Sequence, residues 1–425
     1  MGRFGKRDDL LVHEEEPFNA ETGLGSLTDP VTDTDAFYVR GHGPVPEIDR
    51  SAFRLGVDGM VERELSLSLE TLREAFRERT VTATLQCAGN RRAGLIAVRD
   101  IPGEAPWGPG ATGTASWTGV ALADVLALAG PLSDASDVGF EGADLSPEAE
   151  PVQRFGGSIP LDKASRSEVL LAWAMNGEPL PPVHGAPLRV VVPGYIGARS
   201  VKWLERIELR SRPWPGYFQH VVYRLLPADG TAGPGVGMPL GLVALNSDVL
   251  SPRDGATVTA GPVEARGYAF AGGDRYVARV DVSTDGGASW TQAELLDDLG
   301  RWAWRHWRLT LDLLPGEHEL LVRAWDSSAA TQPDTEAALW NPKGYVNNAR
   351  PRVHVRAIAA YRPYPALTAR IALWARSLQG PALPLCRRCG CDGSTTASEA
   401  RPVEGEARRW LGRPSETRQA SKERQ

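Results

Sequence analysis

The sequence predicts two domains of different class, an α+β domain followed by an all-β sandwich. The first observation is length, because 425 residues exceed what one hydrophobic core usually organises. The second is periodicity: strand and helix spacings are mixed up to about residue 207, and strand alternation dominates later. The third is the content of turn formers, 33 prolines and 45 glycines, which favours many short strands over long helices.

The first domain is expected over residues 31–226, after a polar surface segment at residues 1–30. Residues 81–85 are β-branched and alternating, and predict a strand. Residues 120–128 carry apolar side chains at helical spacing. Residues 188–193 form an apolar run that stops at a proline, and they predict a buried strand. Strands and helices therefore alternate irregularly, as in an α+β fold.

A linker is expected over residues 227–245, where Pro, Gly and Asp accumulate. Residues 246–357 then alternate as short strands, with a turn at Asp285-Gly286-Gly287. About seven strands in roughly 120 residues are typical of an immunoglobulin-like sandwich. Residues 358–425 lose this periodicity and nearly all aromatic residues, and we expect a disordered tail there.

Composition and charge are those of a globular protein and argue against binding to nucleic acid. Apolar residues make up 42% and charged residues 24% of the chain. The net charge of −6 offers no general attraction for phosphate backbones, so a local basic cluster is expected to hold a small anion. No run of about 18 apolar residues, no leader-like segment and no twin-arginine pair occurs, and we expect a cytoplasmic protein without a membrane span.

The four cysteines do not form the framework of a secreted disulfide protein. Cys87 stands alone, whereas Cys386, Cys389 and Cys391 cluster in the expected tail. The tail cluster has three thiols and no nearby histidine as a fourth ligand, so a flexible tail is favoured over a zinc site.

Cys87 lies in the run Leu85-Gln86-Cys87-Ala88-Gly89-Asn90-Arg91-Arg92. A thiolate is a soft ligand for a transition metal, and cationic neighbours favour the thiolate form. Gly89 would let the backbone approach a bulky ligand closely. On spacing alone, however, a buried core cysteine flanked by surface arginines is the commoner arrangement.

The run at residues 85–92 resembles the molybdenum-ligand motif of the sulfite oxidase family. Further segments resemble family motifs in the family's order, namely residues 37–46, 113–120, 195–204, 332–334 and 340–344. The resemblance covers roughly residues 15 to 357. It implies a molybdopterin-binding oxidoreductase domain of the sulfite-oxidase type, followed by an immunoglobulin-like domain that mediates homodimerisation.

The resemblance also implies the cofactor and its ligands. Mo-molybdopterin would be bound with Cys87 as the one protein ligand of molybdenum. The residues expected to hold the pterin and its phosphate are Arg40, His42, Asp144, His184, Arg189, Arg199 and Lys202. Cations and imidazoles suit a phosphate, and a carboxylate can accept hydrogen bonds from pterin N–H groups. For His184 and Asp144, an ordinary loop histidine and a solvated turn residue are the alternatives.

Five side chains fall on the family's oxyanion pocket, and we expect them to bind substrate: Arg40, Arg92, Trp107, Tyr223 and Lys343. Guanidinium groups bind oxyanions through planar forks, the indole would form a wall, and the phenol would hydrogen-bond an oxygen. Taken singly, such arginines are usually surface charges and such aromatic residues usually core. Arg91 is expected to point away, because neighbours on an extended segment face opposite sides.

Three positions depart from the family pattern. Lys343 stands where sulfite oxidases typically have a third arginine, and a lysine keeps the charge but loses the bidentate fork. Gly41 replaces the usual asparagine, and Gly94 replaces a carboxylate. No His-Pro-Gly-Gly or Cys-x-x-Cys-His haem motif occurs, so no haem is expected and electrons would pass to a separate acceptor, a cytochrome or another carrier.

The function implied is oxidation of sulfite, or a related sulfur oxyanion, to sulfate by oxygen-atom transfer at a Cys-ligated molybdenum centre. Lys343 leaves open a reductase or dehydrogenase of the same superfamily, acting on nitrate, a sulfoxide or another sulfur compound. A non-catalytic interaction protein built on the sandwich domain is the alternative from another class, and Cys87, Arg92 and Tyr223 argue against it.

Overall fold

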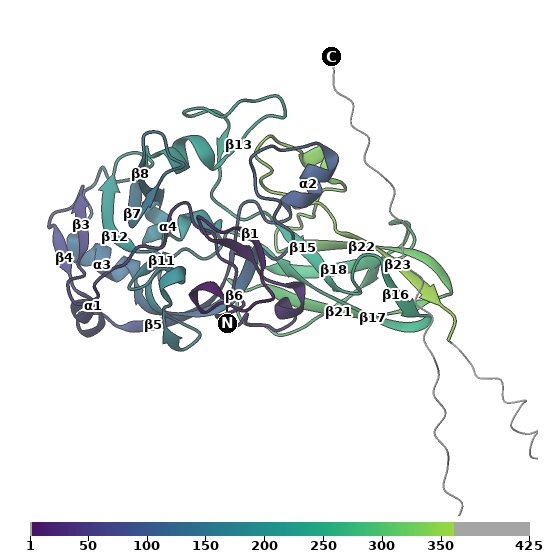
Figure 1. Cartoon of the computed structure of the whole chain (residues 1–425). Coiled ribbons are helices and arrows are strands. Elements are labelled where there is room, and N and C mark those ends of the chain that lie inside the picture. The colour runs from purple at the N-terminus through teal and green to yellow at the C-terminus, as the bar shows by residue number, and fades with distance from the viewer. Residues whose placement is uncertain (1, 361–425) are drawn as a thin grey trace, which may run out of the picture. The chain divides into compact units, whose positions relative to one another are not determined.

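The computed structural model describes residues 2–360 (Figure 1). Nearly all of the tail expected at residues 358–425 lies outside this range, including Cys386, Cys389 and Cys391. No helix within residues 2–360 is long and apolar enough to cross a membrane.

The N-terminal segment packs against the first domain. It contains the 3₁₀ turns η1 (Arg3–Gly5) and η2 (Leu24–Leu27) and the antiparallel pair β1 (Leu11–Glu14) and β2 (Asn19–Glu21). Leu10, Phe18 and Ala20 form a small buried cluster with Val39 and Val183. The segment expected at the surface over residues 1–30 therefore also contributes buried side chains.

The first domain contains two five-stranded sheets. One has the order β10-β9-β6-β5, with β11 also paired to β9; its strands are β5 (Glu78–Gln86), β6 (Thr112–Ala121), β9 (Leu170–Met175), β10 (Glu178–Pro179) and β11 (Arg189–Val191). The other has the order β4-β3-β12-β7-β8; its strands are β3 (Leu55–Gly59), β4 (Leu65–Leu67), β7 (Asp137–Ser146), β8 (Gln153–Pro160) and β12 (Leu204–Arg210). The strands predicted at residues 81–85 and 188–193 are confirmed as parts of β5 and β11.

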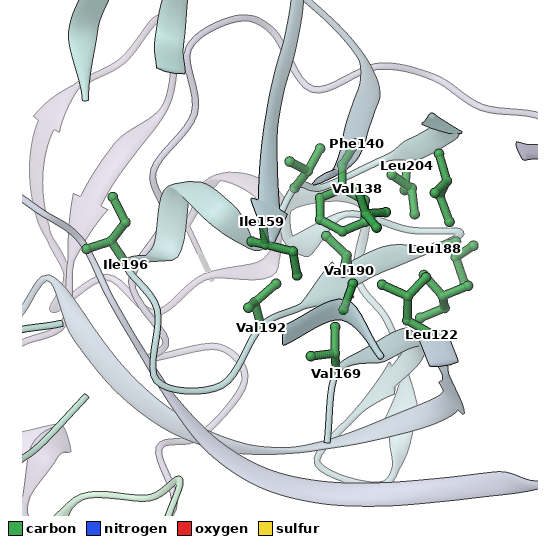
Figure 2. Packing of buried hydrophobic residues seen from close by; sticks show 14 of the residues in the cluster. Leu122, Val138, Phe140, Ile159, Val169, Leu188, Val190, Val192, Ile196 and Leu204 are labelled. Carbon is green, nitrogen blue, oxygen red and sulfur yellow. The ribbon is translucent and has the colours of Figure 1, made fainter. Parts of the chain in front are cut away.

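Short helices complete this domain: α1 (Leu69–Ala75), α2 (Arg92–Val98), α3 (Leu122–Ala129), α4 (Leu161–Ala164), η3 (Pro182–His184), η4 (Gly197–Arg199) and the π-helical turn η5 (Phe218–Val222). The helix predicted at residues 120–128 is confirmed as α3, except that residues 120 and 121 still belong to β6. Apolar side chains from α3 and from both sheets pack together, among them Leu122, Val138, Ile159 and Val190 (Figure 2). This core holds the strand ends that carry the site.

The second domain follows two short paired strands, β13 (Arg224–Leu225) and β14 (Met238–Pro239). One sheet has the order β15-β17-β21-β20, with strands β15 (Asn246–Ser251), β17 (Gly261–Phe270), β20 (Glu294–Leu295) and β21 (Arg305–Leu313). The other has the order β16-β23-β22-β18-β19, with strands β16 (Ala256–Thr259), β18 (Val277–Ser283), β19 (Thr291–Gln292), β22 (Gly316–Asp326) and β23 (Arg352–Ile358). A buried apolar cluster that includes Val280, Trp307 and Val322 draws on both sheets. The predicted succession of an α+β domain and an all-β sandwich is confirmed.

Tyr268, Phe270, Trp304 and Tyr345, which follow the first domain in sequence, belong to the hydrophobic cluster of that domain. The 3₁₀ turn η6 (Glu336–Leu339) likewise contacts α2. The second domain therefore supplies residues to the neighbourhood of Cys87.

Candidate active site

Cys87 follows directly after the last residue of β5, and only 7% of it is exposed. Its backbone N–H donates to the carbonyl of Ala111 at 2.9 Å, which continues the pairing with the β6 side of the sheet. The backbone N–H of Gly89 lies 3.4 Å from the Cys87 sulfur. The thiol is therefore held at a strand end by its own backbone.

A pocket of about 660 Å³, its mouth included, opens beside this sulfur. Eight of the twelve predicted site residues line it: Arg40, His42, Cys87, Asp144, His184, Arg189, Lys202 and Tyr223. They come from four separate stretches of the first domain and from Tyr223 after η5.

Cations line one part of the pocket and have no carboxylate partners. Arg189 donates to the carbonyls of His184 and Ser200, both at 2.9 Å, and Lys202 donates to the carbonyl of Val183 at 3.2 Å. Within the described residues neither cation forms an ion pair. Burial, followed by the charge of Arg189, lowers the pKa of Lys202 to about 7, and burial lowers that of Arg189 to about 10. Such a cluster can bind an anion.

Asp144 offers a buried hydrogen-bond acceptor in the same pocket. Its Oδ1 atom is buried and has no hydrogen-bond partner among the described residues. Burial raises the pKa of this carboxyl to about 6, against the opposing charge of Lys202. A buried acceptor without a donor is uncommon and indicates a missing partner. The N–H groups of a pterin fit this acceptor, and its phosphate fits the nearby cations, so the residues present fit molybdopterin.

His42 links the pocket to its mouth. Its Nδ1 lies 2.7 Å from Oε2 of Glu148, and its Nε2 lies 2.8 Å from the Tyr223 hydroxyl. Burial, followed by the charge of Arg40, lowers the pKa of His42 to about 4, so the imidazole is neutral at pH 7. The neutral ring therefore donates from Nδ1 to the carboxylate and accepts from the phenol at Nε2. Tyr223 is thereby oriented toward His42.

Four predicted residues do not line the pocket. Arg199 is buried and donates to the carbonyl of Leu240 at 2.6 Å. Trp107 belongs to the same apolar cluster as Cys87 and contacts the His13 ring edge-on, with centroids 4.7 Å apart. Arg92 and Lys343 lie beside the pocket, where both contact Glu104. Most of the predicted cofactor ligands therefore line one pocket, whereas three of the predicted substrate ligands, Arg92, Trp107 and Lys343, do not.

Arg92 still reaches the pocket wall through aromatic rings. Its guanidinium carbon lies 5.2 Å from the centroid of Tyr345, and that ring stacks on Tyr223 with centroids 5.6 Å apart. A Cβ atom on Gly89 would lie 2.8 Å from Nη2 of Arg92, which shows how closely the arginine packs on the Cys87 loop. Only glycine at position 89 leaves this space free.

Arg91 diverges from Arg92 for a reason other than the one expected. The segment is not extended: Arg91 adopts a left-handed conformation with φ 64°, and α2 begins at Arg92. Arg91 therefore turns toward the second domain, where it pairs with Asp248 at 3.0 Å and donates to the carbonyl of Ala349 at 2.7 Å. Arg91 thus points away from the pocket, as expected, but because of its left-handed backbone and not because the segment is extended. Arg92 does not line the pocket either, so its role toward the substrate stays a prediction.

The two glycine departures are compensated by residues distant in sequence. The backbone N–H of Gly41 donates to Oδ1 of Asn19 at 2.8 Å, which brings an amide beside Arg40. A Cβ on Gly94 would lie 2.8 Å from Nδ2 of Asn347 and 3.4 Å from Cγ of Glu336. The second domain therefore fills the space in front of Gly94 and places a carboxylate there.

Sequence reasoning missed three charged residues of the site. Lys6 is 2% exposed and its Nζ lies 2.9 Å from Nε2 of His184. Glu148 accepts from His42, and Glu104 pairs with Arg92 and Lys343. Each contact joins positions far apart in the chain or lies in an irregular loop, so no local pattern signals it.

Two family models match the chain. Residues 42–218 match the oxidoreductase molybdopterin binding domain, and residues 242–358 match the Mo-co oxidoreductase dimerisation domain. The fold, the pocket at Cys87 and these matches define a molybdopterin-dependent oxidoreductase.

Individual relatives narrow this class. The chain is 43% identical to sulfite oxidase of Gallus gallus over 358 residues, which cover 80% of this chain and 76% of the relative. It is 42% identical to mitochondrial sulfite oxidase of Mus musculus, covering 82% of this chain and 66% of the relative. The chain belongs to the sulfite oxidase family.

A solved structure supports the fold over the same extent. The sulfane dehydrogenase SoxCD from Paracoccus pantotrophus matches with a TM-score of 0.71 and 28% identity, covering 83% of this chain and 87% of the other. The chain is therefore similar to sulfite oxidases in sequence and to a sulfane dehydrogenase in fold.

Proposed function

We propose that the chain oxidises sulfite, or a related sulfur oxyanion, to sulfate, with Mo-molybdopterin bound through Cys87. The observation that carries the proposal is the pocket in which a buried thiol, cations without counter-ions and the Tyr223 hydroxyl meet. The kinship with sulfite oxidases of animals supports the choice of substrate. Sulfur metabolism is the context that this activity implies.

The cofactor would be held mainly by pocket residues whose charge has no ion-pair partner, or whose acceptor atom has no hydrogen-bond partner, among the described residues. We propose Cys87 as the protein ligand of molybdenum, because a thiolate suits a transition metal. Arg189, Lys202 and His184 would hold the phosphate, and Arg40, His42 and the buried Arg199 would complete the binding site. Asp144 would accept from the pterin through its unpartnered Oδ1. When bound, this cofactor supplies the two-electron oxidation and the transfer of the oxygen atom.

The chain itself would capture and orient the substrate. Arg40, Arg92 and Lys343 attract an oxyanion, and the planar guanidinium groups fix its orientation. The Tyr223 hydroxyl can turn from Nε2 of His42 to an oxygen of the bound anion. Trp107, 1% exposed and packed in the cluster of Cys87, would keep water from that side of the thiol. These groups supply binding and electrostatics, while the cofactor carries the redox step.

We also propose the oligomeric state, the electron acceptor and the location of the protein. Residues 242–358 match a dimerisation domain, which supports a homodimer formed through the sandwich. Electrons would pass singly to a separate acceptor, a cytochrome or another carrier. A cytoplasmic location remains our proposal.

The decisive experiment is metal analysis of the purified full chain, followed by sulfite-dependent reduction of ferricyanide. We expect about one molybdenum per chain, in line with a single Cys87 site, and turnover with sulfite. Nitrate, a sulfoxide and thiosulfate are tested in parallel. If the molybdenum-loaded chain does not oxidise sulfite but turns over one of these compounds, the proposed activity is wrong. The chain would then be the corresponding reductase or dehydrogenase. A chain that stays free of molybdenum in a cofactor-competent host would indicate a non-catalytic protein.

A further inference from the structure

Glu104 occupies the position between the two cations that lie beside the pocket. Its Oε2 is 3.1 Å from Nη2 of Arg92, and its Oε1 is 2.6 Å from Nζ of Lys343. One oxygen of the carboxylate thus faces each cation, as two oxygens of a bound oxyanion would. The chain carries its own anion at the place where the substrate's charge is to be bound.

The two cations depend on Glu104 to different degrees. Arg92 is also held by the carbonyls of Lys343 at 3.1 Å and Ala105 at 3.0 Å, and its side chain is 4% exposed. For Lys343, Glu104 is the one hydrogen-bond partner found among residues 2–360, and a quarter of its side chain is exposed. Loss of the Glu104 charge would therefore release Lys343 while Arg92 stays in place.

Glu104 lies at the solvent side of a turn and not in the packed core. Gly103 precedes it with a φ of +80°, and nothing lies within 4 Å of where its Cβ would be. The Glu104 side chain is 18% exposed, so its carboxylate can reach water without crossing the core. An incoming oxyanion can exchange with this carboxylate rather than having to fit around it.

We propose that Glu104 is a specificity-determining residue, which competes with dianionic oxyanions for Lys343 and Arg92 and so weakens the hold on a dianionic product. This inference rests on the proposed function. Arg40, Arg92 and Lys343 carry three positive charges, and Glu104 with Glu148, whose Oε2 lies 4.0 Å from Arg40, carries two negative charges. One net positive charge remains, which matches a monoanion better than a dianion such as sulfate.

The physical consequence is selective release. Near neutral pH sulfite is partly present as the singly charged hydrogensulfite, whereas its product sulfate is fully dianionic. Three uncompensated cations would therefore retain the product more strongly than the singly charged form of the substrate. A tethered carboxylate returns to Lys343 as the product leaves, so the cations need not be left desolvated and unpaired. Discrimination by a built-in repulsive charge is a common route to specificity.

The test compares Glu104→Gln, which keeps shape and removes charge, with Asp100→Asn, which removes one charge from the same loop at an exposed position. Sulfate and nitrate are titrated calorimetrically into the molybdopterin-loaded full chain, without turnover. Removal of one partly exposed ion pair corresponds to about a fivefold change in affinity. We expect E104Q to bind sulfate about fivefold more tightly, with a smaller gain for nitrate, and D100N to match the wild type.

Steady-state assays give a second readout. E104Q should show stronger product inhibition by sulfate and a lower KM for sulfite, with a kcat that is unchanged or lower. In the double variant E104Q/K343Q most of the gain in sulfate affinity should vanish, because the released cation is gone. A purely structural role for Glu104 would instead lower the melting temperature and cofactor content without tightening sulfate binding.

The outcomes separate this inference from the proposed function. Unchanged or weaker sulfate binding by a folded, fully loaded E104Q protein overturns the role of Glu104, as does an equal gain in D100N. If E104Q tightens sulfate binding as expected but the wild-type chain does not oxidise sulfite, the specificity role stands and only the proposed reaction fails.

Discussion

Two groups of cations lie in and beside the pocket at Cys87, and they differ in what neutralises them. Arg189 and Lys202, which line the pocket, contact backbone carbonyls, and the nearest acid, Asp144, keeps an oxygen without a partner. Arg92 and Lys343, which lie beside the pocket, share the carboxylate of Glu104. The first group is left with a charge deficit that a ligand can fill, while the second already holds an exchangeable anion.

This difference separates a permanent cofactor from a passing substrate. A buried charge without a partner destabilises the protein until its ligand arrives, so the ligand is bound tightly and seldom leaves. A charge that is already paired loses little when its ligand departs, which suits repeated turnover. The degree of internal compensation therefore predicts the residence time of what binds.

The largest expected effect is at Cys87. Cys87→Ser should abolish sulfite-dependent ferricyanide reduction, because a serine hydroxyl is a poor substitute for the thiolate as a metal ligand. The pterin should still bind through the cations, which the substitution does not touch. Retained pterin fluorescence after acid release, with no turnover, is the expected pattern, and sulfite oxidation by this variant would refute the role of Cys87.

Lys202→Met should have opposite effects on the two states of the protein. In the cofactor-free protein it removes a buried cation beside Arg189, so the melting temperature should rise. In the loaded protein it removes a phosphate partner, which should cost about 2 kcal/mol, or roughly thirtyfold in cofactor affinity. Thermal unfolding of both forms and pterin release after dilution measure the two effects.

Lys163→Met is the matched control, because Lys163 is also buried but pairs with Glu168 at 2.7 Å. Its removal leaves that carboxylate without its cation and should lower the melting temperature of cofactor-free and loaded protein alike. Lysine variants that change stability in the same direction at both sites would show that the compensation argument is wrong.

The stability of the cofactor-free protein should depend on pH, because two largely buried lysines form no ion pair within residues 2–360. Burial lowers the pKa values of Lys6 and Lys202 from 10.5 to about 7. Between these limits the unfolded chain binds protons that the folded chain does not, so stability rises as pH increases from about 7 toward 10.5. A bound phosphate would keep Lys202 charged and would favour the charged form of Lys6 through its negative charge. Melting temperatures should therefore rise from pH 7 to 9 in cofactor-free protein only, and an equal rise in loaded protein would contradict this.

The sequence was sufficient for the fold class and for the chemistry that local patterns carry. The alternation at residues 81–85 predicted β5, and the family resemblance implied a binding pocket that includes Cys87. The structure has a pocket beside Cys87, directly after that strand. The helix start at Arg92 was not expected, because the left-handed Arg91 that precedes it depends on contacts with Asp248 and Ala349 of the second domain.

Charge compensation could not be predicted in this way. Whether Lys343 is free or paired depends on Glu104, which is 239 positions earlier in the chain. Lys6 lies in a polar segment without periodicity, and only the packing of that segment brings it to His184. Periodicity reports burial along one element, whereas the partner of a buried charge is a property of tertiary contacts.

The smallest expected effect concerns Lys6, which acts on the cofactor pocket through His184. While Lys6 is protonated it has only donors, so its 2.9 Å contact makes Nε2 of His184 the acceptor and leaves the ring proton on Nδ1. Lys6→Met removes that constraint and one cation, and should accelerate pterin release about fivefold, less than Lys202→Met because the contact is indirect. Lys6→Arg should restore most of the retention, and Arg7→Met, at a side chain paired with Asp9 and 40% exposed, should leave it unchanged. If Lys6→Met releases the pterin no faster than the Arg7→Met control, the N-terminal segment only covers the domain, and the charge deficit is confined to the residues that line the pocket.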